Sequence, residues 1–179
     1  MGPFLNPPPT LMDGVIRLDA PTVADAEAHV AGEDREIRLR FESPDPDFPA
    51  TLERAREVFA GWMATHREDG PTIVYAVRGP SNQLAGGCKI RRLAAGGAAV
   101  SYWIYPAFRR LGYGARALAL LCTVAAEDPE LTRLEARIDA DNLASRRTAE
   151  ANGFIDNGLI EDEAQDGQIV MRRIYLRAP

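Results

Sequence analysis

One segment in the middle of the chain constrains the fold more than any other, because a strand pattern, a tight turn and a helix pattern follow one another without a break. The apolar residues 98–105 predict a strand, which Pro106 ends because proline cannot donate a backbone hydrogen bond. Two arginines and two glycines form the turn, and residues 112–127 carry the apolar spacing of a buried helix. A strand that turns directly into a buried helix indicates a mixed α/β domain.

Strand and helix patterns alternate along the rest of the chain. Residues 72–77 and 83–92 are rich in β-branched and apolar side chains, and the turn at 79–82 between them predicts a hairpin. In residues 133–138 apolar and charged side chains alternate, as in a strand with one buried face. Thr22 is expected to cap the first helix. The predicted strands are 15–18, 72–77, 83–92, 98–105, 133–138 and 169–176, and the predicted helices are 21–30, 51–66, 112–127 and 142–152.

The length of 179 residues suits one compact domain, and 46% hydrophobic residues supply its core. The prolines in residues 1–13 cannot donate backbone hydrogen bonds, so we expect a flexible N-terminal tail there and one domain over residues 14–179. An acidic, proline-rich loop is expected over residues 42–49. The fold class is therefore α/β (α+β), with a mixed central sheet of about six to seven strands flanked by about four helices.

The charge balance argues against nucleic acid as a partner, since 21 basic and 26 acidic residues give a net charge of −5. No apolar run is long enough to span a membrane and the N-terminus lacks a secretory pattern, so we expect a cytoplasmic protein. Cys88 and Cys122 lie far apart in apolar segments, which is typical of reduced, buried cysteines. No group of His, Cys and Asp residues has metal-ligand spacing, and we expect no metal.

The glycine turn has the chemistry of an anion site. Gly112 and Gly114 let the backbone approach a ligand closely, and the first amides of the following helix are left without partners. The helix dipole and the charges of Arg109 and Arg110 favour a pyrophosphate there. The spacing matches neither the P-loop nor the dinucleotide fingerprint. Glycines that merely start a helix, with arginines in solvent, remain the alternative reading.

Two motifs together resemble a known family. Arg109-x-x-Gly112-x-Gly114 opens a long apolar helix, and Asn142-x-x-Ser145 begins a second helix that is closed by glycine and phenylalanine at 153–154. This combination is similar to the GNAT N-acetyltransferases, in particular the branch of the ribosomal-protein alanine N-acetyltransferases. The resemblance covers roughly residues 72–176, whereas the first 70 residues match only in the order of their elements.

The resemblance implies acetyl-CoA as the co-substrate and a central sheet that is splayed in the middle. The pantetheine arm would enter between the strand that ends near Tyr105 and the strand at 134–138, and its diphosphate would lie on the glycine turn. The residues that the resemblance assigns to the cofactor are Trp103, Ile104, Tyr105, Arg109, Arg110, Leu111, Gly112, Tyr113, Gly114, Ala115 and Asn142.

The resemblance also proposes catalytic residues. Ser145 would hydrogen-bond the departing sulfur, although a serine that only bonds the preceding turn is an alternative. Related enzymes use a tyrosine of this helix as the acid, but residues 146–151 contain none. Glu163, or else Glu161, would be the general base, from a loop after Gly158.

The sequence thus predicts an N-acyltransferase that moves acetyl from acetyl-CoA to a primary amine, either a protein N-terminus or a small molecule, by direct attack on the thioester. It would act without nucleic acid or membrane, as a monomer or a homodimer. A module that senses acyl-CoA without turnover is the alternative, because it would need only the donor site.

Overall fold

The computed structural model describes residues 4, 8–41, 47, 50–67, 70–163 and 169–179. Within these residues the chain forms eight strands, which are β1 (Thr10–Met12), β2 (Arg17–Asp19), β3 (Thr72–Arg78), β4 (Leu84–Arg92), β5 (Gly97–Ile104), β6 (Arg133–Asp139), β7 (Ile155–Glu163) and β8 (Ile169–Arg177). The α-helices are α1 (Asp25–Gly32), α2 (Arg35–Arg40), α3 (Leu52–Arg67), α4 (Tyr113–Ala126) and α5 (Leu143–Ala151). The loop predicted over residues 42–49 falls, apart from Asp47, outside the described residues.

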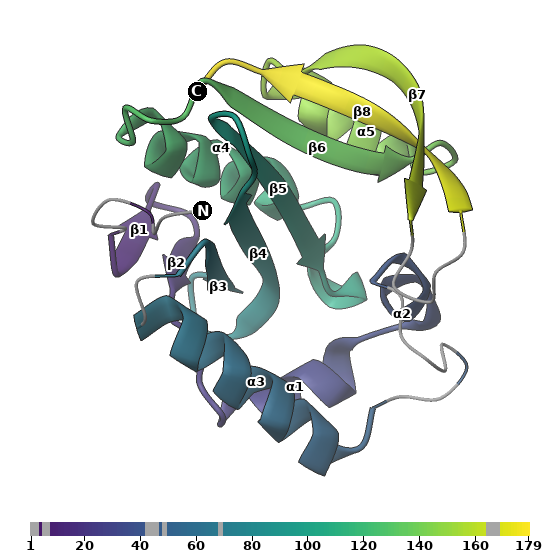
Figure 1. Ribbon diagram of the computed structural model, residues 1–179. Coiled ribbons are helices and arrows are strands. Elements are labelled where there is room, and N and C mark those ends of the chain that lie inside the picture. Colours follow the sequence, from purple (N-terminus) through teal and green to yellow (C-terminus); the bar gives the residue numbers. More distant parts are fainter. Residues whose placement is uncertain (1–3, 5–7, 42–46, 48–49, 68–69, 164–168) are drawn as a thin grey trace.

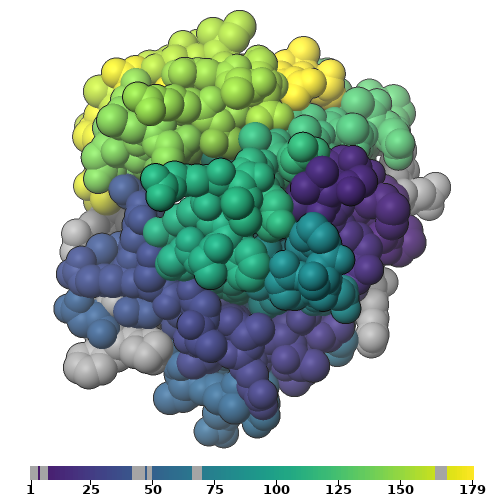
Figure 2. Space-filling view, turned by 180° about the vertical axis from the view of Figure 1, so that it is seen from behind, coloured from purple at the N-terminus to yellow at the C-terminus, as the bar shows by residue number. Residues whose placement is uncertain are grey.

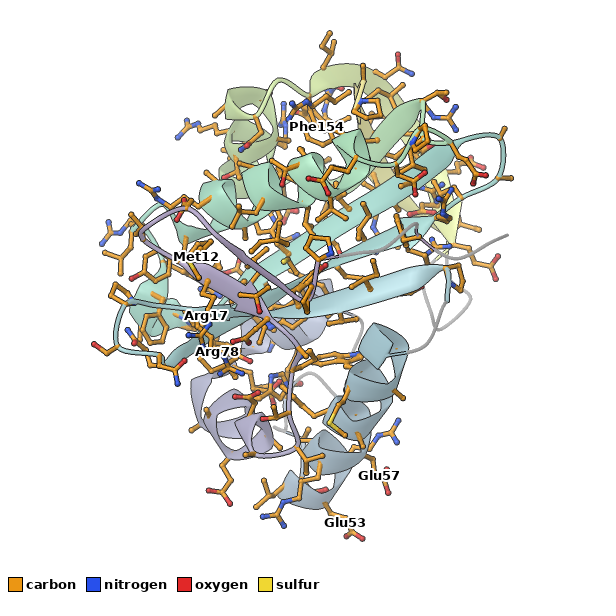
Figure 3. The ribbon with its side chains drawn as sticks, turned by 90° about the vertical axis from the view of Figure 1, so that its left-hand side faces the viewer. Met12, Arg17, Glu53, Glu57, Arg78 and Phe154 are labelled. Carbon is orange, nitrogen blue, oxygen red and sulfur yellow. The ribbon has the colours of Figure 1, made fainter. Side chains whose placement is uncertain are left out.

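All eight strands belong to one sheet, in the order β1-β2-β3-β4-β5-β6-β8-β7. Helices α4 and α5 cover one face, and α1 and α3 cover the other (Figures 1 and 3). The larger core lies under α4, where Leu118 and Leu121 are fully buried and the helix packs against β4 and β5. A smaller aromatic core under α1 and α3 contains Phe59, Trp103 and Tyr105. This three-layer arrangement confirms the predicted single mixed α/β domain.

The sheet divides between β5 and β6. These two strands pair in parallel only over residues 97–99 and 133–135, and the last pair joins Ala99 to Glu135. Beyond it β5 continues to Ile104 beside β4, while β6 continues to Asp139 beside β8. Figure 1 shows the two strands diverging toward their C-terminal ends. The splay that the resemblance implied is therefore present.

Several residues of the predicted N-terminal tail contact the sheet. Thr10–Met12 forms β1, which pairs with β2 at the edge of the sheet, and Phe4 is buried with 4% exposure. The phenol of Tyr75 donates to the carbonyl oxygen of Pro8 at 2.9 Å. These contacts attach part of the predicted tail to the sheet. A proline-rich segment lacks some backbone N–H donors, but its carbonyl oxygens can still accept hydrogen bonds. Residues 1–3 and 5–7 of that tail lie outside the described residues.

The described residues contain eight strands and five α-helices, where six to seven strands and about four helices were predicted. One helix was missed, and two local predictions were wrong. Helix α2 was missed because it is short and buries only Ile37, so it has no apolar periodicity to detect. The loop predicted after Gly158 is part of strand β7, which places Glu161 and Glu163 on a strand. Thr22 does not cap α1, since both its backbone N–H and its hydroxyl donate to the carboxylate of Asp25.

Candidate active site

The turn after β5 presents a row of unused backbone donors at the start of α4. A short 3-10 turn (Pro106–Phe108) follows the strand, and Arg110 and Gly112 then take positive φ angles of 62° and 78°. In the described part of the chain, no acceptor lies within hydrogen-bond distance of the amides of residues 111–115, and the first bond runs from Arg116 N–H to the carbonyl of Gly112 at 3.1 Å. Free donors at the positive end of the helix dipole favour an anion here.

A cavity of about 380 Å³ opens beside this turn, between α2 and the first turns of α4 and α5. In Figure 2 the blue-green surface of the turn lies between the purple-blue region of α1 and α2 and the yellow-green region of α5 and β7. Two predicted cofactor residues, Tyr105 and Leu111, are not among those that line it. The predicted residues that do are Trp103, Ile104, Arg109, Arg110, Gly112, Tyr113, Gly114, Ala115, Asn142 and Ser145.

A second cavity, of about 240 Å³, lies between the parted stretches of β5 and β6. Its walls come from β4, β5, β6 and β8 and from the end of α2. A molecule that fills the first cavity would therefore present its end to the second. The residues that line both cavities are Arg40, Phe41, Tyr102, Asn142 and Ser145.

Ser145 lies at this junction and is held on two sides. Its amide donates to Oδ1 of Asn142 at 3.1 Å, so Asn142 is the N-cap of α5, as predicted. Its hydroxyl oxygen lies 2.9 Å from the phenol oxygen of Tyr102 on β5. The sequence did not single out Tyr102, because the two residues are 43 positions apart and no motif links them.

The surroundings of Tyr102 fix its ring and keep its proton in place. A Cβ atom at Gly114 would come within 3.0 Å of Cε2 of the ring, so α4 packs directly on it. Burial raises the pKa of the Tyr102 phenol above its usual value of 10.0, although hydrogen bonds with Ser145 and Thr148 act in the opposite direction. The phenol is therefore a hydrogen-bond donor at neutral pH.

The two arginines of the turn have different surroundings. Arg109 forms ion pairs with Asp34 at 2.8 Å and Glu36 at 3.1 Å, and its Nε donates to the carbonyl of Ile104 at 3.2 Å. It thereby joins α2 to the end of β5. Arg110 is exposed, lines the first cavity and has no ion-pair partner among the described residues. Of the two, Arg110 is the one with unpaired charge.

The backbone of β5 offers fewer free groups than predicted. The amide of Tyr105 donates to the carbonyl of Ala85 at 2.9 Å, and its carbonyl accepts from Phe108 N–H at 2.9 Å, so both groups are occupied. Alternate residues of a strand direct their amides to opposite sides. The amide of Ile104 therefore faces the gap between β5 and β6, whereas those of Trp103 and Tyr105 face β4.

Helix α2 is fastened across the site by Arg40. Its Nη1 lies 2.8 Å from Asp139 and 2.7 Å from Asp141 at the end of β6, and hydrogen bonds to Asp141 and Asp139 raise the pKa of the guanidinium. Asp139 is also paired with Arg172 at 2.9 Å. Glu36 and Asp139 are the acidic side chains that line the two cavities, and each is already engaged by arginines.

Glu163 is not placed in either cavity. Its neighbour Asp162 pairs with Arg137 at 2.7 Å and Arg172 at 2.9 Å, and both arginines line the second cavity. Successive residues of a strand point to opposite faces, so Glu161 and Glu163 point away from that side, and both are exposed. The role of Glu163 as a base stays an untested prediction.

The split sheet, the free amides and the two cavities that share lining residues are the features expected of an acetyltransferase that takes its acetyl group from acetyl-CoA. A family model described as the acetyltransferase (GNAT) domain matches residues 16–155, and the chain belongs to this family. The predicted family, fold and acetyltransferase activity are thereby confirmed.

Solved structures share this fold at low identity. Mycobacterium smegmatis RimJ in complex with CoA-disulfide has a TM-score of 0.77 and 19% identity, over 99% of this chain and 90% of that one. The Salmonella typhimurium acetyltransferase that modifies the N-terminal serine of ribosomal protein L7/L12 has a TM-score of 0.71 and 21% identity, over 93% and 96%. The microcin C7 self-immunity acetyltransferase MccE, with acetyl-CoA and AMP, has a TM-score of 0.77 and 18% identity, over 93% and 94%. None of the curated proteins compared matches the sequence.

The described residues also bear on the expectations about membrane spans, metal sites and cysteines. None of the helices described is both long and apolar enough to cross a membrane. The same residues contain no group of three His, Cys, Asp or Glu side chains placed to hold a metal ion. Cys88 and Cys122 are buried free thiols, as predicted, and burial raises the pKa of the Cys88 thiol.

Proposed function

We propose that this protein transfers acetyl from acetyl-CoA to the α-amino group of a peptide or small molecule, by direct attack of the neutral amine on the thioester. Membership of the GNAT family supports the donor. The observation that carries the proposal is the row of unpartnered amides at residues 111–115, beside a cavity that leads into the gap between β5 and β6.

Acetyl-CoA would lie in this site with its diphosphate at the glycine turn and its thioester between β5 and β6. The diphosphate of CoA would accept hydrogen bonds from the amides of residues 111–115 and pair with Arg110, since Gly112, whose Cβ position is open, leaves the backbone accessible. The pantetheine arm would follow the gap, where the amide of Ile104 is directed. The thioester would then lie where the two cavities meet, beside Ser145.

The protonation state of the amine favours an α-amino group as the acceptor. Only a neutral amine attacks a thioester, and an α-amino group has a pKa of about 8 where a lysine has about 10.4. Neither cavity is lined by an acidic side chain that stands apart from an arginine. An acceptor that is partly neutral near pH 7 suits this site better than lysine. The Salmonella neighbour modifies an N-terminal serine, whose amine is also an α-amine.

The test is a thiol-release assay with acetyl-CoA and a matched set of acceptors. The set contains peptides with a free N-terminal serine or alanine, the same peptides with a blocked N-terminus and one lysine, an amino acid and a polyamine. We expect release with the free α-amines, at a rate that rises with pH through the pKa of the acceptor itself.

Equal rates for the blocked lysine peptides at neutral pH would contradict the proposed acceptor. Binding of CoA without thiol release on any amine would favour the alternative, an acyl-CoA sensor.

A further inference from the structure

The contact between Tyr102 and Ser145 lies where the two cavities meet, and the family motifs do not account for it. The two hydroxyl oxygens are 2.9 Å apart, and both residues line both cavities. Each hydroxyl carries one hydrogen and two lone pairs, so either one can donate to the other. The phenol can also donate to the backbone carbonyl of Ser145, but that oxygen lies farther away, at 3.4 Å. The arrangement decides which hydrogen is left for a molecule in the cavity.

In one arrangement Ser145 donates to Tyr102, and the serine hydrogen is used within the protein. In the other arrangement Tyr102 donates to Oγ of Ser145, and the serine hydrogen is free to point into the cavity. Negative charge near Ser145 favours the second arrangement, because both O–H dipoles then point toward the charge and strengthen each other.

We infer that Tyr102 is a positioning residue, whose phenol donates to Oγ of Ser145 and thereby directs the serine hydrogen at the sulfur of acetyl-CoA. The inference rests on the proposed function, because that function places the thioester beside Ser145. As the C–S bond breaks, its electron pair stays on sulfur and the serine O–H hydrogen-bonds the thiolate. The amine loses its extra proton to solvent, and neither hydroxyl transfers a proton.

The pair is built to keep this geometry. The ring of Tyr102 packs against Gly114 at 3.0 Å from an ideal Cβ position, and Asn142 caps the first turn of α5 through the Ser145 amide at 3.1 Å. Both oxygens are thus attached to fixed elements on opposite walls of the site. The phenol stays protonated at working pH, which keeps it a donor.

The test measures the pKa of the thiol of CoA bound to the protein, from the ultraviolet absorbance of the thiolate during a pH titration. It needs no acceptor, so its result does not depend on which amine is used. Since one charge-assisted hydrogen bond stabilises the thiolate, we expect both Tyr102→Phe and Ser145→Ala to raise the pKa of the bound thiol by about one unit. The double variant is expected to match Ser145→Ala alone, because Tyr102 acts only through the serine.

The matched control is Tyr175→Phe. Tyr175 is a fully buried tyrosine whose hydroxyl also bonds α5, through Glu150 at 3.1 Å, but it lines neither cavity. It should leave the pKa of the bound thiol unchanged. A pKa that Tyr102→Phe does not move while CoA still binds would overturn the inference alone. Failure of the wild-type protein to bind CoA would overturn the proposed function as well.

Discussion

Gly114 and Tyr102 touch so closely that no side chain fits between them: a Cβ atom at position 114 would lie 3.0 Å from Cε2 and 3.3 Å from Cδ2 of the ring. Gly114→Ala should therefore displace the ring by a few tenths of an ångström and lengthen its hydrogen bond to Ser145. We expect kcat to fall about tenfold while the KM for acetyl-CoA changes little, since displacements of this size in a positioned pair mainly affect the chemical step.

Alanine also favours a helix more than glycine does, so the control must separate helix propensity from displacement. Gly61→Ala on α3 adds the same methyl group to a helix with no atom within 4 Å of the new Cβ. It should raise the melting temperature slightly and leave kcat unchanged. A kcat of Gly114→Ala equal to that of wild type would show that the ring position does not matter.

Gly112 has a positive φ angle and also lies where the proposed ligand would approach the backbone. Its φ is 78°, and an added Cβ would meet no protein atom within 4 Å, so the methyl group of Gly112→Ala would occupy space left for a ligand. We expect the dissociation constant of CoA, measured by calorimetry, to rise about tenfold. The control is Gly158→Ala, which has a φ of 97° and equally open space but lies on β7, away from both cavities. Equal affinity in wild type and Gly112→Ala would argue against the diphosphate site.

The sequence predicted the donor half of the site because the relevant signals are local. Gly112 and Gly114 mark the turn, and Asn142 caps the helix three residues before Ser145, so short motifs carry the information. The contact with Tyr102 depends on which face of β5 the ring leaves from and on how α5 packs over it. Neither the direction of the ring nor the packing of α5 can be predicted from the spacing of residues in the sequence.

The missed elements were those with few buried residues. Strand β7 is an edge strand on which Ile155 is 73% exposed and Leu159 is 52% exposed, and its few apolar residues do not alternate with polar ones in the sequence. The register of β7 with β8 then decides which acidic side chain faces the cavity, and that register is fixed by pairing between strands.

The variant Glu163→Gln tests whether Glu163 is the general base, as the sequence predicts, or an exposed residue without a catalytic role, as its position on β7 indicates. If Glu163 were the general base, the variant would lose activity most at pH values below the pKa of the acceptor. Because the side chain is exposed on the face opposite Asp162, we expect the pH–rate profile to match that of the wild type within twofold. Glu161→Gln, on the same exposed face, serves as the control and should behave identically. A selective loss for Glu163→Gln at low pH would restore its assignment as the base.

Acid stability should depend on the buried pair of Asp25 and Arg78, which joins α1 to β3. The two nitrogen atoms of the guanidinium reach the two carboxylate oxygens at 2.8 and 2.9 Å. Burial alone would raise the pKa of Asp25, but hydrogen bonds from Arg78 and Thr22 outweigh it and hold that pKa below 3.8. Because the pKa of Asp25 is lowered in the folded state, the pair stabilises the fold at pH values above the unfolded pKa of about 3.9. This stabilisation is lost as the pH falls through the folded pKa.

Asp25→Asn should therefore lower the free energy of unfolding near pH 7 by up to about 3 kcal/mol, measured with urea, because the buried guanidinium of Arg78 then keeps only one of its two carboxylate partners, Asp19 at 2.7 Å. The difference from wild type should shrink as the pH falls below about 4 and should vanish only once the pH has passed below the lowered folded pKa, where the wild-type carboxylate is itself protonated. Glu57→Gln is the comparison: Glu57 is an exposed residue that points outward on α3 (Figure 3) and pairs with Arg54 at 2.9 Å. Its loss should cost no more than about 0.5 kcal/mol at any pH. A difference for Asp25→Asn that stays constant down to low pH would show that packing, and not the ion pair, accounts for it.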